Sequence, residues 1–135
     1  MAEGRDGNKI DLSRIPGPDE AVNDMIFLEG MQDGWYAITN TAMRVGFAMR
    51  YPAELFKHLW YWMVLRGGRD YPWWSATYNI ALEPCATLPV LAEAVERGEA
   101  LRLSAGESRE IELLAIAFEG PESVNEVSAD GEIRE

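Results

Sequence analysis

One stretch near the middle of the chain alternates between apolar and other residues. In residues 43–50 (MRVGFAMR), Val45, Phe47 and Met49 fall on one face, and two arginines, a glycine and an alanine fall on the other. Because successive side chains of a strand point to opposite faces, this alternation predicts a half-buried β-strand.

Other apolar stretches predict further strands, separated by turns that contain glycine or proline. Residues 57–65 (KHLWYWMVL) are apolar almost throughout, which predicts a strand covered on both faces. Residues 100–118 alternate on either side of a turn at Ala105 and Gly106, and therefore predict a hairpin. The other predicted strands occupy residues 25–30, 34–42 and 78–84.

Only residues 88–98 (LPVLAEAVERG) have the composition of a helix, with Gly98 as its C-terminal stop. Neither end of the chain has the pattern of a strand or a helix. The prolines and glycine of IPGPDE prevent a regular element near the start, and the last residues have almost no apolar content. The pattern therefore predicts an all-β protein with about seven strands and one short helix. Its expected parts are a flexible arm over residues 1–24, an antiparallel β-sandwich over residues 25–118, and an acidic disordered tail over residues 119–135.

Charge is concentrated at the two ends. The formal net charge is −11, and residues 1–24 hold six acids against three bases, while residues 119–135 hold six acids against one base. Excess negative charge repels phosphates and anionic lipids, so we expect neither nucleic acid nor a membrane as a partner. The start lacks the apolar core of a signal peptide, and the single Cys85 cannot form an internal disulfide. These features together predict a cytoplasmic protein.

The residues that commonly hold metals and phosphates are scarce. One cysteine and one histidine cannot form a Cys/His metal cluster, and the RGGRD turn lacks the following helix and the lysine of a phosphate-binding loop. We therefore expect no metal and no cofactor. A nucleophilic pair of Cys85 and His58 has no support from spacing.

Glu83 and His58 are the candidate catalytic residues. Glu83 ends the predicted strand over residues 78–84 on the face opposite its apolar residues, where it is either a general base at a loop rim or an exposed acid. His58 is the only histidine, and it shares a strand face with Trp60 and Trp62, so it is either an acid catalyst or a core residue.

The stretch YPWWSATYNIALEPC, residues 71–85, suggests a sugar site. Tryptophan rings stack on the apolar face of a pyranose, and Trp73 and Trp74 are adjacent residues of a loop, so that both cannot easily point into one core. Arg66 and Arg69 flank the two glycines of the same loop and either bind sugar hydroxyls or are solvated.

Three segments in order resemble the C-terminal part of galactose mutarotase-like (aldose 1-epimerase-like) proteins. They are RVGFAMRYPAELFKHLWYWMVLRGG, YPWWSATYNIALEPC and ALRLSAGESREIELLAIAF, and the resemblance covers roughly residues 25–118. It is to a less characterised branch of that superfamily. The resemblance implies a β-sandwich with a hexose cleft.

In that family a glutamate takes the proton of the anomeric hydroxyl and a histidine protonates the ring oxygen. The resemblance implies that Glu83, in ALEP, is the base of such an isomerase. The family's histidines belong to an earlier portion of a longer fold, and His58 lies in a different segment.

Three functions remain open. The chain is a mutarotase-like isomerase that acts on an aldose, a carbohydrate-binding module without turnover, or a partner subunit or shortened remnant. An incomplete sandwich exposes edges and an inner face, so pairing with a copy of itself or with a complementing chain is an expected outcome.

Overall fold

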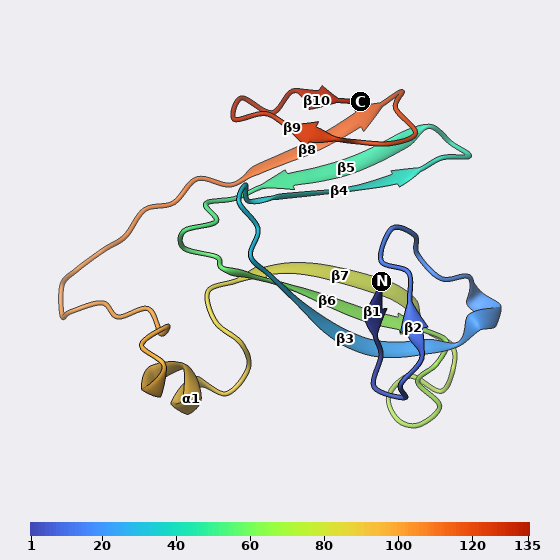
Figure 1. Ribbon diagram of the computed structural model, residues 1–135, viewed down its shortest axis with the longest axis horizontal. Coiled ribbons are helices and arrows are strands. Elements are labelled where there is room, and N and C mark those ends of the chain that lie inside the picture. Colours follow the sequence, from blue (N-terminus) through green and yellow to red (C-terminus); the bar gives the residue numbers. More distant parts are fainter. The chain divides into compact units, whose positions relative to one another are not determined.

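The computed structural model describes residues 1–135 and consists mainly of β-strands (Figure 1). Two sheets have three strands each and two sheets have two strands each. The helical elements are the 3-10 turn η1 (Pro18–Glu20) and the helix α1 (Leu91–Glu96). The predicted all-β class with antiparallel sheets and one short helix is confirmed. No helix has the length and apolar character required to cross a bilayer.

The chain divides into two compact units, whose boundaries differ from the predicted ones. The first unit consists of Met1–Glu29 and Leu59–Cys85, and the second of Gly30–His58 and Ala86–Glu135. Each unit has one three-stranded sheet and one two-stranded sheet, with strand β6 (His58–Leu65) beginning one residue before the boundary at Leu59.

The first unit is centred on strand β6, which is the middle strand of its sheet. The sheet has the order β3-β6-β7, and the strands β1 and β2 form a separate antiparallel pair. The bounds are β1 (Ala2–Glu3), β2 (Lys9–Ile10), β3 (Val22–Glu29), β6 (His58–Leu65) and β7 (Tyr78–Cys85).

One face of this sheet carries the core of the first unit. Alternate β6 residues Tyr61, Met63 and Leu65 are buried together with Ile10 of β2. Side chains from neighbouring segments pack against them: Leu12, Val22, Ile26, Ile80 and Leu82. Because strand side chains alternate, Trp60 and Trp62 of β6 lie on the opposite face.

Residues 1–24 carry secondary structure where the sequence predicts a flexible arm. β1 and β2 are joined by a tight turn in which the Gly4 N–H donates to Asn8 O at 2.8 Å. Ile10 enters the core, and the Tyr78 hydroxyl donates to Pro16 O at 2.7 Å. The composition of this segment does not reveal that two of its few apolar residues, Ile10 and Leu12, have core partners far along the chain.

The second unit is built around β5, the middle strand of the sheet β4-β5-β8. Both neighbours are antiparallel to it, with Ala48 opposite Ala37 and Ile116. The strands of the unit are β4 (Trp35–Asn40), β5 (Val45–Arg50), β8 (Leu114–Glu119), β9 (Glu126–Val127) and β10 (Ile133–Arg134).

The predicted strand over residues 43–50 is present as β5, but its buried face is not the apolar one. The exposure pattern is the reverse of the predicted one, since Ala48 is fully buried whereas Val45 and Phe47 are exposed. The reason is that the ring of Phe118, on the paired strand β8, lies so close to Gly46 that a Cβ at this position would collide with it. Small residues at 46 and 48 therefore make room for the large side chains of β8.

Residues 119–135 carry the antiparallel pair β9 and β10 where the sequence predicts a disordered tail. Val127 is fully buried, and the Arg50 guanidinium donates to Val127 O at 2.7 Å. The turn between the two strands is closed by Ser128, whose hydroxyl donates to the Asp130 carboxylate and whose N–H donates to Glu132 O. A long-range bond and one buried valine order a segment whose composition is polar.

The predicted hairpin over residues 100–118 forms only in its second half. The turn is present, since the Glu107 N–H donates to Ser104 O at 3.0 Å, but residues 101–113 are exposed and belong to no strand. Only β8 is paired, and its partner is β5. The helix is also shorter than the predicted 88–98, although Gly98 follows it with φ of 71° as expected of a stop.

Candidate functional site

Four of the six predicted site residues lie on the loop of residues 66–77 that joins β6 to β7, here called the β6–β7 loop. Its base is closed by the Arg66 N–H, which donates to Thr77 O at 2.8 Å. Within the loop, the Ser75 N–H donates to Gly68 O at 2.6 Å, and the Trp73 N–H donates to Asp70 O at 2.9 Å. These backbone bonds give the loop a defined conformation.

The start of the loop is anchored on β3 of the same unit. The Gly67 N–H donates to Val22 O at 3.3 Å. A Cβ at Gly67 would lie 2.6 Å from Asn23 N and still closer to Ala21 O and Val22 C. Only glycine therefore fits where the loop crosses the β3 backbone.

Trp73 turns back onto the sheet. Its ring meets that of Trp62 edge to face, with centroids 5.4 Å apart. A Cβ at Gly68 would lie 2.8 Å from Trp73 Cβ, so the glycine lets the loop backbone approach this side chain closely. Trp73 is thus part of the packing under the loop, and it is only partly accessible.

Trp74 points the other way and pairs with Tyr71. The Trp74 side chain is 64% exposed and Tyr71 is 80% exposed, and their rings meet edge to face at 5.3 Å. Trp74 and Ser75 both have left-handed backbone, with φ of 41° and 55°, which is uncommon for residues other than glycine. We call Tyr71 and Trp74 the aromatic platform.

Arg66 and Arg69 are exposed on the same loop. Neither guanidinium makes an ion pair or hydrogen bond within the chain, so the donors of both face solvent. With Asp70 as the only acid of residues 66–77, the loop has a formal charge of +1 on a chain of net charge −11. The arginines are therefore available to a ligand that rests on the aromatic platform.

Glu83 lies on β7, half-buried, on the sheet face opposite Ile80 and Leu82. It shares this face with Trp60 and Trp62. Glu83 is the fifth residue after Tyr78, which lies at the loop end of β7, and this corresponds to about 17 Å of extended strand. Glu83 is therefore at the far end of β7 from the platform.

The surroundings of Glu83 also affect Cys85, two residues further along the strand. Burial raises the pKa of the Cys85 thiol, and the negative charge of Glu83 raises it further. The two side chains are on the same face of β7. A thiol held in its neutral form is a poor nucleophile, which does not favour a Cys85-based reaction.

His58 is buried, with 6% of its surface exposed, and belongs to the second unit, whereas the other five predicted site residues belong to the first. Its burial matches the core-residue interpretation rather than an acid catalyst open to substrate. The structure also has no group of three or more His, Cys, Asp or Glu side chains placed to hold a metal ion.

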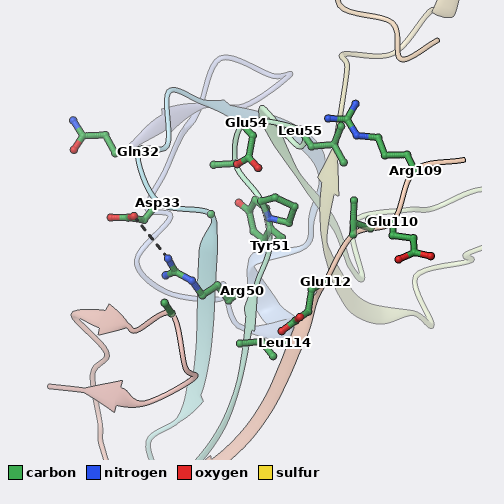
Figure 2. A pocket seen from close by; sticks show the side chains of 15 residues that line it. Gln32, Asp33, Arg50, Tyr51, Glu54, Leu55, Arg109, Glu110, Glu112 and Leu114 are labelled. Carbon is green, nitrogen blue, oxygen red and sulfur yellow. Dashed lines mark ion pairs between the residues drawn. The ribbon is translucent and has the colours of Figure 1, made fainter. Parts of the chain in front are cut away.

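A cavity of about 480 Å³ lies elsewhere, in the second unit, and none of the six predicted residues lines it (Figure 2). Its wall includes Tyr51 and Leu55 on one side and residues 109–112 on the other. At its rim, the guanidinium of Arg50 forms an ion pair with the Asp33 carboxylate, at 4.0 Å between nitrogen and oxygen. Burial raises the pKa of Tyr51 to about 12, and its hydroxyl is directed at Met31 Sδ at 3.2 Å.

The sequence pattern indicates the β6–β7 loop but does not indicate that Tyr71 is the partner of Trp74. Tyr71 belongs to the same YPWW stretch, and its position three residues before Trp74 was the available signal. The lining of the cavity in the second unit had no comparable signal, because its residues come from four separate segments.

Comparisons of this chain with models of known protein families, with curated proteins and with solved structures found no match. The resemblance to mutarotase-like proteins therefore rests on the three sequence segments alone.

Proposed function

We propose that the chain binds carbohydrate, with the aromatic platform of Tyr71 and Trp74 as the contact surface for a pyranose ring. The observation that carries the proposal is the exposure of two paired aromatic rings on a loop whose backbone is fixed by hydrogen bonds. Large aromatic side chains normally bury most of their surface, so an ordered, exposed pair suggests a contact surface.

The platform supplies what a sugar ring requires. The C–H groups of a pyranose pack on the face of an indole, and this contact replaces water on two apolar surfaces. The hydroxyl groups of the sugar need fixed polar partners, and the guanidinium groups of Arg66 and Arg69 are donors on the same loop. A bound sugar would therefore have both an apolar and a polar contact.

The backbone at Trp74 supports the same proposal. Two consecutive residues other than glycine in left-handed conformation cost free energy, on the order of 1 kcal/mol each. The loop bonds at Gly68, Asp70 and Trp73 hold this conformation. Its result is that Trp73 enters the packing while Trp74 is displayed.

Binding of a sugar panel to variants tests the proposal. Hexoses, uronic acids and sugar phosphates are titrated against the chain by isothermal calorimetry. We expect Trp74→Ala to weaken binding about tenfold, because a stacked ring contributes about 0.5–1.5 kcal/mol beyond the area that it buries. Met43→Ala is the control, since Met43 is 71% exposed and lies in the second unit.

The arginines define which sugars bind best. If Arg66 and Arg69 contact the ligand, uronic acids bind more tightly than the matching neutral hexoses, and Arg69→Gln removes this preference. The proposal is wrong if no sugar binds, or if Trp74→Ala and Met43→Ala bind sugar equally well.

Anomer exchange by a mutarotase-like reaction is the second candidate. It is favoured by the position of Glu83, which is half-buried on the sheet face that also carries Trp60 and Trp62. A carboxylate beside aromatic rings can accept the proton of an anomeric hydroxyl. The reaction would be followed by polarimetry with freshly dissolved aldoses, comparing Glu83→Gln with the control Glu3→Gln, an exposed acid of the same unit. A rate that Glu83→Gln leaves unchanged would exclude the reaction at this site.

A further inference from the structure

The edge strand of the second unit continues past the end of its partner. β8 begins at Leu114, which pairs with Arg50, the last residue of β5. The next residues of the β5 segment are Tyr51 and Pro52, and the Tyr51 N–H donates to Gly34 O. Residues 109–113, which precede β8 and are here called the overhang, therefore have no neighbouring strand within the chain.

The overhang is exposed although it has the pattern of a strand. Ile111 is 47% exposed and Leu113 is 46% exposed, and they alternate with Glu110 and Glu112. No backbone hydrogen bond joins residues 108–113 to another part of the chain. An exposed strand edge with apolar side chains is a template for pairing with a further strand.

One side of the overhang is separated from the rest of the unit by the cavity of Figure 2. Residues 109–112 line this cavity opposite Tyr51 and Leu55, and the segment runs on from β8 in an extended course. The other side is continuous with the outer edge of β8, which is the edge strand in the order β4-β5-β8. A single edge thus runs from Arg109 to Glu119.

The hydrogen bonds of the sheet determine which groups point outward along this edge. The Gly120 N–H donates to Arg44 O, toward the β5 side. Because the backbone groups of successive strand residues point to opposite sides, the even-numbered residues of β8 face β5 and the odd-numbered ones face outward. With the same alternation carried into the overhang, the outward-pointing donors and acceptors belong to residues 109, 111, 113, 115, 117 and 119.

We propose that this edge is the interface for a second copy of the chain, paired antiparallel about a two-fold axis at Leu114. In this register Leu113 lies opposite Ala115 of the second copy, and Ile111 lies opposite Ala117. The outermost pair is Arg109 with Glu119, and because of the two-fold symmetry each pair occurs twice in the interface. All of these pairs join odd-numbered residues, as the outward-pointing backbone groups require.

Side-chain complementarity favours this register over the one with the two-fold axis at Leu113. It places the opposite charges of Arg109 and Glu119 directly across from each other, and both side chains are exposed without an ion pair in the single chain. It also sets the large exposed side chains of Ile111 and Leu113 against two alanines. Moving the two-fold axis by one residue to Leu113 would place Glu107 opposite Glu119, which are like charges.

The charge pair gives the first test. The association constant is measured by sedimentation equilibrium for the unaltered chain, Arg109→Glu, Glu119→Arg and the double variant. Each single variant sets two like charges opposite each other in both symmetric positions, so we expect about tenfold weaker association. The double variant restores the opposite charges and returns association to within about threefold of the unaltered chain. Arg102→Glu, at another exposed position of the same segment, leaves association unchanged.

A crosslinking experiment tests the register itself. In a Cys85→Ser background, Leu113→Cys and Ala115→Cys are made as separate chains, both at exposed positions. Residues that exchange both hydrogen bonds across antiparallel strands have Cα atoms about 5.5 Å apart, which a disulfide can span. We expect a disulfide-linked dimer when the two chains are mixed under mild oxidation, and none from either chain alone.

Several results would overturn the proposal. They are a monomer at the highest soluble concentration, a dimer whose association constant is unchanged by Arg109→Glu, and crosslinking of Leu113→Cys with itself as efficiently as with Ala115→Cys. Association with a different protein in place of a second copy would also overturn it. Sugar binding is not involved in any of these measurements.

Discussion

Replacing Gly67 by alanine should destabilise the first unit and loosen the β6–β7 loop. The new Cβ would lie 2.6 Å from Asn23 N, whereas ordinary van der Waals contact begins at 3.4 Å. To restore ordinary contact, the new Cβ and Asn23 N would have to move apart by at least 0.8 Å. The atoms that would have to move belong to the backbone of β3, which is fixed by its place in the sheet.

The expected cost follows from two opposing contributions. Overpacking costs about 1–3 kcal/mol, and the obstructing atoms are backbone, which favours the upper half of this range. Alanine restricts the unfolded chain more than glycine does, which offsets about 0.4–1 kcal/mol. The net loss of unfolding free energy should be about 2 kcal/mol, or a melting temperature lower by about 6–10 °C for a chain of this size.

Thermal and urea unfolding, followed by tryptophan emission, measure this effect. Gly17→Ala is the matched control, because its new Cβ would meet nothing closer than Glu20 Oε1 at 3.6 Å and its φ is −67°. The control should stay within about 0.5 kcal/mol of the original chain. Equal unfolding midpoints for the two variants would show that the close contact of Gly67 with the β3 backbone does not hold the loop.

Three further predictions concern single side chains. Met63→Ala removes a fully buried side chain and should lower the free energy of unfolding by about 2–5 kcal/mol, while Met43→Ala should change it little; similar urea midpoints would contradict the described core. Hydrogen bonds from Arg14 at 2.8 Å, then from the Gly17 N–H, lower the pKa of Glu20 to about 2, so the stability it adds is present above pH 4.5 and is lost as pH falls toward 2. Carboxyl NMR should show this midpoint, and Arg14→Gln should raise it; an unchanged midpoint would contradict the pairing. Burial and the charge of Glu83 raise the pKa of Cys85, so Glu83→Gln should shift the pH profile of alkylation by iodoacetamide to lower pH. An identical profile would show that Glu83 does not act on the thiol.

Sequence periodicity predicted the presence of the two central strands. The alternation of residues 43–50 and the apolar run of residues 57–65 correspond to β5 and β6. The buried face of β5 was not predictable, because it depends on the side chains of β8 about 70 residues later in the chain. Local pattern establishes that a strand exists, whereas its buried face depends on its partners.

The structure at the two ends of the chain was also not predictable from local sequence. Residues 1–24 and 119–135 are polar enough to resemble disordered segments, yet Ile10 and Val127 are buried through contacts with distant strands. A few apolar residues are sufficient when a sheet elsewhere in the chain offers them a site. Composition averages over a segment and cannot detect such single contacts.

For the candidate site, the sequence identified the loop but not its geometry. Adjacent tryptophans predicted that one would be displayed, and the left-handed backbone at Trp74 decides which one it is. The separation of Glu83 from this loop agrees with the predicted strand over residues 78–84, since β7 spans Tyr78–Cys85 and Glu83 lies near its far end. The proposed binding surface and the proposed base are therefore separate features of the first unit.

The most direct test of sugar binding at the platform is a titration followed by the indole N–H signals in the ¹⁵N–¹H spectrum. The chain has five tryptophans, which are assigned by single Trp→Phe substitutions. A sugar bound at the aromatic platform should shift the Trp74 signal in a saturable way and leave the Trp35 signal of the second unit unchanged. An unchanged Trp74 signal at saturating sugar would show that the aromatic platform does not bind the sugar.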